Sequence, residues 1–189
     1  MISTSIFFVL LLVMLGGVEL WLRLSIPASS GDSIFEYTLE SKRYKVMKRN
    51  AEIVTWGSKL QTNNLGFRDE HSVVPPKQSD EFRIIVLGDS FTVSAGVDFQ
   101  DIFTSQLEKS LQQQYPHVQV INLAVGGYNI LQYALVLEEV GLALQPDLVL
   151  VAVFPYNDLN NDTYAANYRQ AMGEVAAEQK EPWYKGLNI

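Results

Sequence analysis

Three apolar runs in the second half of the chain restrict its fold more than any other feature of the sequence. The runs cover residues 83–88, 118–124 and 147–154, and each is nearly continuous in Ile, Val and Leu. Strands that are buried on both faces of a parallel sheet have this composition, whereas strands with one solvated face alternate apolar and polar residues. The runs therefore predict three buried parallel strands.

The first segment between these runs has the spacing of an amphipathic helix. Phe103, Leu107 and Leu111 recur every four residues, which places them on one face of a helix. Asp101 or Asp98 is available as the N-cap, because a short carboxylate side chain can accept a bond from the first backbone N–H groups. This segment predicts one helix that packs against the sheet.

The second segment carries a broader apolar stripe that includes Leu131, Leu135 and Leu142, and Pro146 stops the helix just before the third run. The predicted order is strand, helix, strand, helix, strand. Because such crossovers are right-handed, this order gives an α/β fold, a doubly wound parallel sheet with helices on its faces. A complete sheet of this kind has about five strands, so three strands leave it incomplete, with an apolar edge after the third.

The amino-terminal segment is apolar over the length of a membrane span. Residues 5–24 are interrupted only by Glu19 and Arg23, both near the end of the segment. The first small-x-small cleavage site, at residues 28–30, lies far downstream of the apolar core, which favours an uncleaved anchor over a signal peptide. We assign residues 1–26 to a membrane anchor or signal, with membrane contact through residues 5–24; a buried core helix is the alternative.

Residues 27–80 have an irregular polar pattern and are interpreted as a linker region with one hairpin. Two short strand-like segments flank Gly57-Ser58, a two-residue connection with glycine in the first turn position. The cationic cluster at residues 41–49 is interpreted as a solvated face, and a formal net charge of -7 argues against a nucleic-acid partner. The chain has no cysteine, which excludes disulfides and thiolate zinc sites.

Polar residues follow each of the three predicted strands. Because the carboxyl ends of parallel strands meet at one edge of the sheet, three loops are expected to meet there. An exposed hydroxyl beside converging hydrogen-bond donors is what acyl transfer needs, since the donors stabilise the oxyanion of the tetrahedral intermediate. The polar residues are Gly88, Asp89 and Ser90 in the first loop, Asn122, Gly126 and Gly127 in the second, and Asn157 and Asp158 in the third.

Each of these residues also has an ordinary structural interpretation. Gly-Asp-Ser after a strand is common turn and helix-cap chemistry, with Asp89 accepting backbone N–H bonds in the turn. Gly126-Gly127 can simply open a strand-to-helix turn, and Asn157-Asp158 can cap a helix after Asn161. The combination of the three loops favours the catalytic interpretation. The stretch that begins at Asn157 lacks the central glycine and distal glutamate of a calcium loop, so we expect no metal.

The order and spacing of these residues resemble the SGNH or GDSL hydrolases, which include esterases, lipases and acyltransferases on a flavodoxin-like sheet. The first family block, Gly-Asp-Ser, is similar to residues 88–90, and the resemblance implies that Ser90 is the nucleophile. The second block, an Asn followed five residues later by a Gly, falls on Asn122 and Gly127, and implies an oxyanion role for Gly127. The third block implies an oxyanion role for Asn157, although Pro155 stands where the family has glycine.

The resemblance extends from about residue 62 to 160, because the segment NNLGFRDE also resembles one that precedes the domain in some membrane-anchored members. It implies that residues 81–189 form a partial domain of this family. The implied substrate is an acylated sugar, a lipid or a small ester, and no cofactor is implied. A membrane-anchored enzyme whose domain lies outside the cytoplasm fits these expectations.

The family's Asp-x-x-His block, which supplies the base for the serine, has no counterpart after Asn157. His117 precedes the second predicted strand and is expected at the opposite edge of the sheet, about 20 Å from Ser90; His71, in a long loop, is the alternative base. The chain is therefore expected to be an amino-terminal fragment or a degraded copy of a longer protein. Two functions stay open: a serine esterase or acyltransferase whose base lies outside this chain, and a non-catalytic fragment or binding module.

Overall fold

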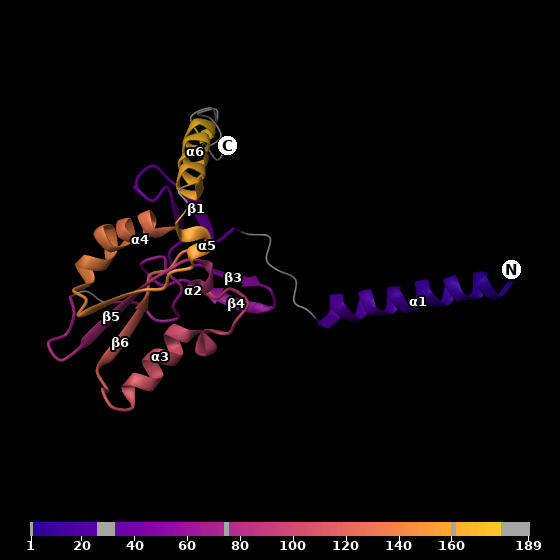
Figure 1. Cartoon of the computed structure of the whole chain (residues 1–189), viewed down its shortest axis with the longest axis horizontal. Coiled ribbons are helices and arrows are strands. Elements are labelled where there is room, and N and C mark those ends of the chain that lie inside the picture. The colour runs from indigo at the N-terminus through magenta and orange to yellow at the C-terminus, as the bar shows by residue number, and fades with distance from the viewer. Residues whose placement is uncertain (1, 26–32, 74–75, 160–161, 179–189) are drawn as a thin grey trace, which may run out of the picture.

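A parallel sheet of three strands forms the centre of the protein, as Figure 1 shows. The computed structural model describes residues 2–25, 33–73, 76–159 and 162–178. In the sheet, β5 (Phe82–Leu87) lies between β6 (Val118–Asn122) and β7 (Leu148–Val151) and runs parallel to both. The predicted α/β fold with three parallel strands is confirmed.

Helices cover both faces of this sheet because successive residues of a strand point to opposite sides. Ile84 of β5 belongs to an apolar cluster with Leu107 of α3 (Phe103–Gln112). Ile85, the next residue, belongs to a second cluster with Val136 at the end of α4 (Ile130–Val136). The continuous apolar composition of the strand thus serves two cores, which confirms the doubly wound arrangement.

The predicted details of the two helices are corrected by the structure. Neither Asp98 nor Asp101 caps α3: Ile102 is its N-cap residue, Asp101 ends the short helix η1 (Phe99–Asp101), and Asp98 accepts a hydrogen bond from Ser58 Oγ at 2.6 Å. The predicted stripe of α4 is also wrong, since Leu131 and Leu142 are exposed. The inward face carries Gln132, Tyr133 and Val136 instead.

A change in helix geometry after α4 accounts for the exposure of Leu142, which lies beyond it, but not for that of Leu131. The chain continues through a π-helical turn, η2 (Leu137–Gly141), and a 3-10 turn, η3 (Leu142–Leu144). A π turn inserts one extra residue and rotates all later side chains around the axis. The helix then ends because Gln145 adopts a left-handed conformation with φ 54°, immediately before Pro146.

The region before the sheet contains two hairpins, one of which the sequence did not indicate. β3 (Glu52–Thr55) and β4 (Ser58–Gln61) form the predicted hairpin, but its turn is Trp56-Gly57 and not Gly57-Ser58. Both turn residues have positive φ, 48° and 81°, as a type I′ turn requires. The unexpected hairpin pairs β1 (Phe35–Tyr37) with β2 (Lys45–Met47).

The hairpin β1–β2 also corrects the interpretation of residues 41–49 as a solvated face. Met47 and Arg43 are buried, and Lys45 is half-buried. On the other side of the hairpin lies α6 (Asp162–Glu178), where the rings of Tyr164 and Tyr168 lie 5.3 and 4.9 Å from that of Tyr44. The hairpin is therefore packed between the α/β domain and α6 (Figure 1).

The amino-terminal helix α1 (Ile2–Ser25) is long and apolar enough, over Thr4–Ser25, to cross a membrane. None of that span is buried in the protein, so the alternative of a core helix is wrong. Figure 1 shows α1 projecting away from the sheet and its helices. A helix of this kind is a candidate membrane anchor or signal sequence.

Candidate active site

The first loop places Ser90 at the start of a short helix, α2 (Ser90–Val93). Asp89 is the N-cap residue and accepts a hydrogen bond from the N–H of Phe91 at 2.9 Å, which confirms its predicted turn role. Ser90 itself caps nothing: it is the first helical residue, its side chain is exposed, and its hydroxyl has no hydrogen-bond partner among the described residues. The hydroxyl is therefore free to meet a ligand.

Gly88 is required in this loop by packing. A Cβ atom at this position would lie 2.1 Å from Oγ1 of Thr92, which is buried one helical turn after the glycine. Any side chain at position 88 would therefore push α2 away from the end of β5. Gly88 therefore allows the close packing that sets the position of α2 and of Ser90 at its start.

The second loop is held directly against the first. The N–H of Val125 donates to the carbonyl of Gly88 at 3.2 Å, and Asn122 Nδ2 donates to the carbonyl of Thr92 at 3.1 Å. A Cβ placed on Gly126 would lie 3.7 Å from Cβ of Ser90, so these two residues lie side by side. Gly127 has φ +79°, a left-handed conformation that favours glycine.

The third loop joins the same edge of the sheet. Ala152 donates its N–H to the carbonyl of Leu87 at 2.9 Å, and the ring of Phe154 lies 4.5 Å from the ring of Phe91 in α2. The loop then forms α5 (Pro155–Asp158). The predicted meeting of three loops at the carboxyl ends of the strands is observed.

Within the third loop, Asp158 is buried and holds the turn together. Its Oδ2 accepts a hydrogen bond from the N–H of Phe154 at 2.6 Å, so it caps α5 itself and not a later helix. Burial raises the pKa of Tyr133, and the neighbouring carboxylates of Asp158 and Asp89 raise it further. Tyr133 therefore stays neutral beneath the loops. Asn157 lies in α5, but its side chain falls outside the described part of the structure.

Lys45 and Phe35 of the hairpin β1–β2 also contact the second loop, and sequence reasoning missed both. The Nζ atom of Lys45 donates to the carbonyl of Gly126 at 2.7 Å and lies 3.9 Å from the centre of the Phe35 ring. Cζ of Phe35 is 3.4 Å from the position of a Cβ on Gly126. Burial lowers the pKa of Lys45 to about 8.

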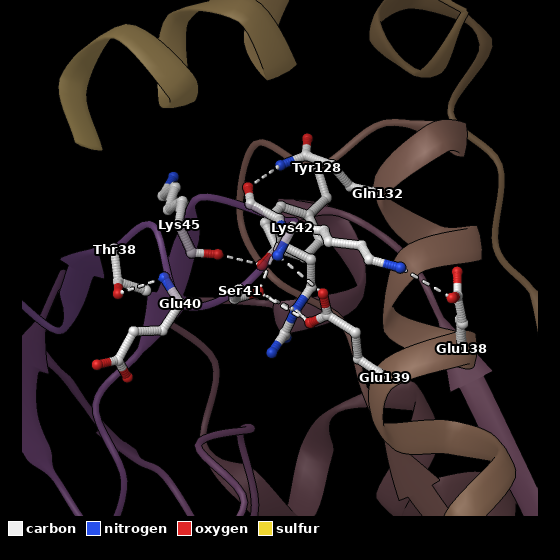
Figure 2. A network of polar contacts seen from close by, with 10 residues as sticks. Thr38, Glu40, Ser41, Lys42, Lys45, Tyr128, Gln132, Glu138 and Glu139 are labelled. Atoms are coloured by element: carbon white, nitrogen blue, oxygen red, sulfur yellow. Dashed lines mark hydrogen bonds and ion pairs between the residues drawn. The ribbon is translucent and has the colours of Figure 1, made fainter. Parts of the chain in front are cut away.

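A polar network fixes the hairpin to the α/β domain. Figure 2 shows the Tyr128 hydroxyl directed at the backbone carbonyl of Lys45, with Ser41 directed at Glu139. Arg43 Nε donates to Oε2 of Glu139 at 2.8 Å, and this ion pair is largely shielded from solvent. Gln132 Nε2 donates to the carbonyl of Arg43 at 3.1 Å. These contacts fix the backbone on either side of Lys45.

The segment NNLGFRDE supports the opposite end of α2. Arg68 is buried, and its guanidinium donates to the carbonyls of Val93 and Ser94 at 2.6 Å each and to that of Val97. The last carbonyls of a helix have no partner within the helix, and a cationic side chain can satisfy them. Arg68 therefore anchors the helix that begins with Ser90.

Neither histidine has a described contact with Ser90. Nδ1 of His117 is 3.5 Å from Asp80, and the residue precedes β6 at the amino-terminal end of the sheet. Nδ1 of His71 lies 3.5 Å from Asp69, and His71 lines a cavity of about 480 Å³ beside α3, which Asn122 also lines. Among the described residues, no group of three or more His, Cys, Asp or Glu side chains could hold a metal ion.

Comparison with known proteins adds one finding. The profile described as the GDSL-like lipase/acylhydrolase family matches residues 86–184, more than half of the chain. The match begins within β5 and includes all three loops of the site. Neither the curated proteins nor the solved structures gave a significant match.

Proposed function

Because this chain belongs to the GDSL-like lipase/acylhydrolase family, we propose that it is a serine esterase or acyltransferase that acts on an O-acyl ester through Ser90. Family membership supports an esterase or acylhydrolase activity and an ester-type substrate in general. The observation that carries the finer assignment is the exposed Ser90 at the start of α2, beside Gly126 of the second loop.

In this proposal the hydroxyl oxygen of Ser90 attacks the ester carbonyl carbon, and a tetrahedral intermediate with a negatively charged oxygen forms. The backbone N–H groups of Ser90 and Gly127 and the carboxamide of Asn157 donate to that oxygen. Collapse of the intermediate breaks the bond to the alcohol, which leaves with the proton that Ser90 has lost. Water or a second hydroxyl then takes the acyl group and returns a proton to Ser90.

A serine hydroxyl needs a base to become a strong nucleophile. We assign this role to neither His71 nor His117, because their described contacts are with Asp69 and Phe99 and with Asp80. Gly88, Asp89, Asn122 and Asp158 support the site by holding the three loops in place.

Exposed aromatic rings beside Ser90 are consistent with an acyl or sugar group as part of the substrate. The rings of Phe91 and Phe154 lie 4.5 Å apart, and that of Tyr156 lies 6.1 Å from Phe154. Phe91 and Tyr156 are largely exposed. Apolar rings at the mouth of a site stabilise a ligand by removing its apolar surface from water.

We further propose that α1 anchors the protein in a membrane, that residues 27–80 connect it to a family domain at residues 81–189, and that the domain lies outside the cytoplasm. Because the chain lacks cysteine, the single substitution Lys59→Cys, at an exposed position, can report on which side of the membrane the domain lies. Labelling of intact cells by a membrane-impermeant maleimide is expected; labelling only after lysis would place the domain inside.

Because neither histidine of the chain is assigned as the base, the catalytic proposal is tested in detergent with a version of the protein that includes a base for Ser90, using p-nitrophenyl acetate and a fluorophosphonate probe. Wild type and a Ser105→Ala control are expected to hydrolyse the ester and to bind the probe, because Ser105 lies in α3. Ser90→Ala is expected to lose both while keeping its circular dichroism spectrum. Equal rates and equal labelling in wild type and Ser90→Ala would refute the role of Ser90.

A further inference from the structure

Lys45 occupies an unusual position for a lysine. Its ammonium is half-buried between the Phe35 ring and the second loop, and a Cβ on Gly127 would lie 3.4 Å from its Nζ. Among the described residues it forms no ion pair: Figure 2 shows the side chain pointing away from Glu138 and Glu139. Its only charge-stabilising contacts there are the Gly126 carbonyl and the aromatic ring.

Burial of the Lys45 ammonium costs free energy, which suggests that the position serves a function. Removing an ammonium from water without a carboxylate partner is unfavourable, and the lowered pKa of Lys45 reflects that burial. A cation–π contact recovers only about 0.5–2 kcal/mol. Desolvated ionisable groups with few partners occur preferentially at functional sites, and this one touches the loop that faces Ser90.

The geometry of a peptide group explains what the ammonium does there. In a trans peptide the C=O and the N–H point in opposite directions, and the carbonyl of Gly126 and the N–H of Gly127 belong to one peptide. With Lys45 bound to that carbonyl, the N–H of Gly127 points to the other side of the peptide. A charge-assisted bond to the carbonyl also polarises the amide and makes its N–H a stronger donor.

The peptide between Gly126 and Gly127 would be difficult to fix otherwise. Glycine has no Cβ to restrict rotation, so a peptide flanked by two glycines can turn over at little steric cost. A bond from Lys45 to the Gly126 carbonyl selects one of the two orientations. The Tyr128 hydroxyl in turn holds the backbone carbonyl of Lys45, so the lysine is itself fixed.

We propose that Lys45 is a positioning residue for the oxyanion hole, which holds the peptide between Gly126 and Gly127 by its carbonyl so that the Gly127 N–H faces and stabilises the substrate oxyanion. This inference rests on the proposed function, in which Gly127 is an oxyanion donor. It extends the site to the hairpin β1–β2, which precedes the family domain. Because an oxyanion exists only in the transition state and intermediate, Lys45 acts on kcat and not on KM.

Replacement of Lys45 by cysteine, followed by alkylation of that cysteine, tests this role. The alkylation is specific because the chain has no other cysteine. Lys45→Cys is expected to lower kcat by about tenfold or more, because loss of a whole oxyanion donor costs about 100- to 1000-fold. Alkylation with bromoethylamine recreates a lysine-like ammonium and is expected to restore kcat. Alkylation with iodoacetamide, which adds an uncharged group, is the control and restores nothing.

Two kinetic results would overturn the proposal. A raised KM with unchanged kcat in Lys45→Cys would make the residue a substrate-binding group. Equal recovery by bromoethylamine and iodoacetamide would show that only the volume of the side chain matters.

A second measurement does not depend on turnover and separates the two proposals. In glycine-labelled protein, Lys45→Met is expected to move the amide ¹⁵N resonance of Gly127 upfield, since the amide loses polarisation. Lys42→Met, which removes an exposed ion pair with Glu138, is the matched control and leaves that resonance in place. An unmoved Gly127 resonance in Lys45→Met refutes the role of Lys45, whereas absence of serine-dependent activity in wild type refutes only the role of Ser90.

Discussion

Lys45 should make the stability of the protein depend on pH in a way that a methionine at the same position does not. Burial lowers the pKa of this lysine from 10.5 to about 8. Between these two pH values the unfolded chain binds more protons than the folded chain, so the free energy of unfolding rises with pH in that window. Below pH 8 both states are protonated, and the full cost of burying the charge is present.

The size of the effect follows from the shift. One pKa unit corresponds to about 1.4 kcal/mol, which gives an upper limit of about 3.5 kcal/mol for the shift from 10.5 to about 8. Lys45 keeps part of its surface in water, and screening of that part reduces the expected change to about 1–2 kcal/mol. Packing differences between lysine and methionine do not change with pH and cancel in the comparison.

The assay is urea denaturation of wild type and Lys45→Met at intervals from pH 7.5 to 10. The free energy of unfolding of wild type is expected to rise relative to the variant as the pH increases. Lys42→Met is the control: the hydrogen bond and charge of Glu138 raise the pKa of Lys42 above 10.5, so its stabilising effect is lost only above the pH range of the assay, and the difference between wild type and this variant is expected to stay constant. A constant difference between wild type and Lys45→Met would show that the ammonium is not desolvated.

Two further predictions concern the supports of α2. Gly88→Ala is expected to destabilise the protein by about 1–3 kcal/mol, because the new methyl group meets Thr92 Oγ1 at 2.1 Å; a double-mutant cycle with Thr92→Ala should show coupling, and strict additivity would refute the clash. Arg68→Met is expected to cost about 1–3 kcal/mol, because its three backbone carbonyl partners lose their donor. The exposed Arg49→Met is the control in urea denaturation, and an equal loss in both variants would remove the special role of Arg68.

The sheet and the meeting of the loops could be predicted because they depend on patterns local in sequence. A continuous apolar run such as residues 83–88 has few alternatives to a buried strand, and the edge at which strands end follows from their parallel direction. The order of Ser90, Gly127 and Asn157 along the chain then indicated one site. In the structure Ser90 is exposed and lies beside Gly126, while its catalytic role stays a prediction.

The hairpin β1–β2 could not be predicted, because its strands have only three residues each. Strands this short are stabilised by tertiary contacts, here with α6 and the second loop. Lys45 was missed for the same reason: its partner Gly126 is 81 positions away. Within a cationic run a half-buried lysine has no local signature that separates it from its solvated neighbours.

Gln132 illustrates a related limit. A glutamine in an amphipathic helix is ordinarily assigned to the solvent face, yet it is fully buried and donates to the carbonyl of Arg43. The leucine pattern of the segment therefore indicated the wrong face. The side chain that faces inward is chosen by a partner in the hairpin, which lies far away in sequence.

Contacts across the proposed boundary at residue 81 argue that residues 27–80 are more than a tether. Phe35 and Lys45 touch the glycine loop, and Arg68 holds the end of α2, although the family match begins only at residue 86. Between Ser25, the end of α1, and Ser33 the chain can extend over at most about 30 Å. If α1 crosses a membrane, the hairpin β1–β2, whose Lys45 donates to the Gly126 carbonyl, is therefore also the described part of the domain nearest to the anchor along the chain.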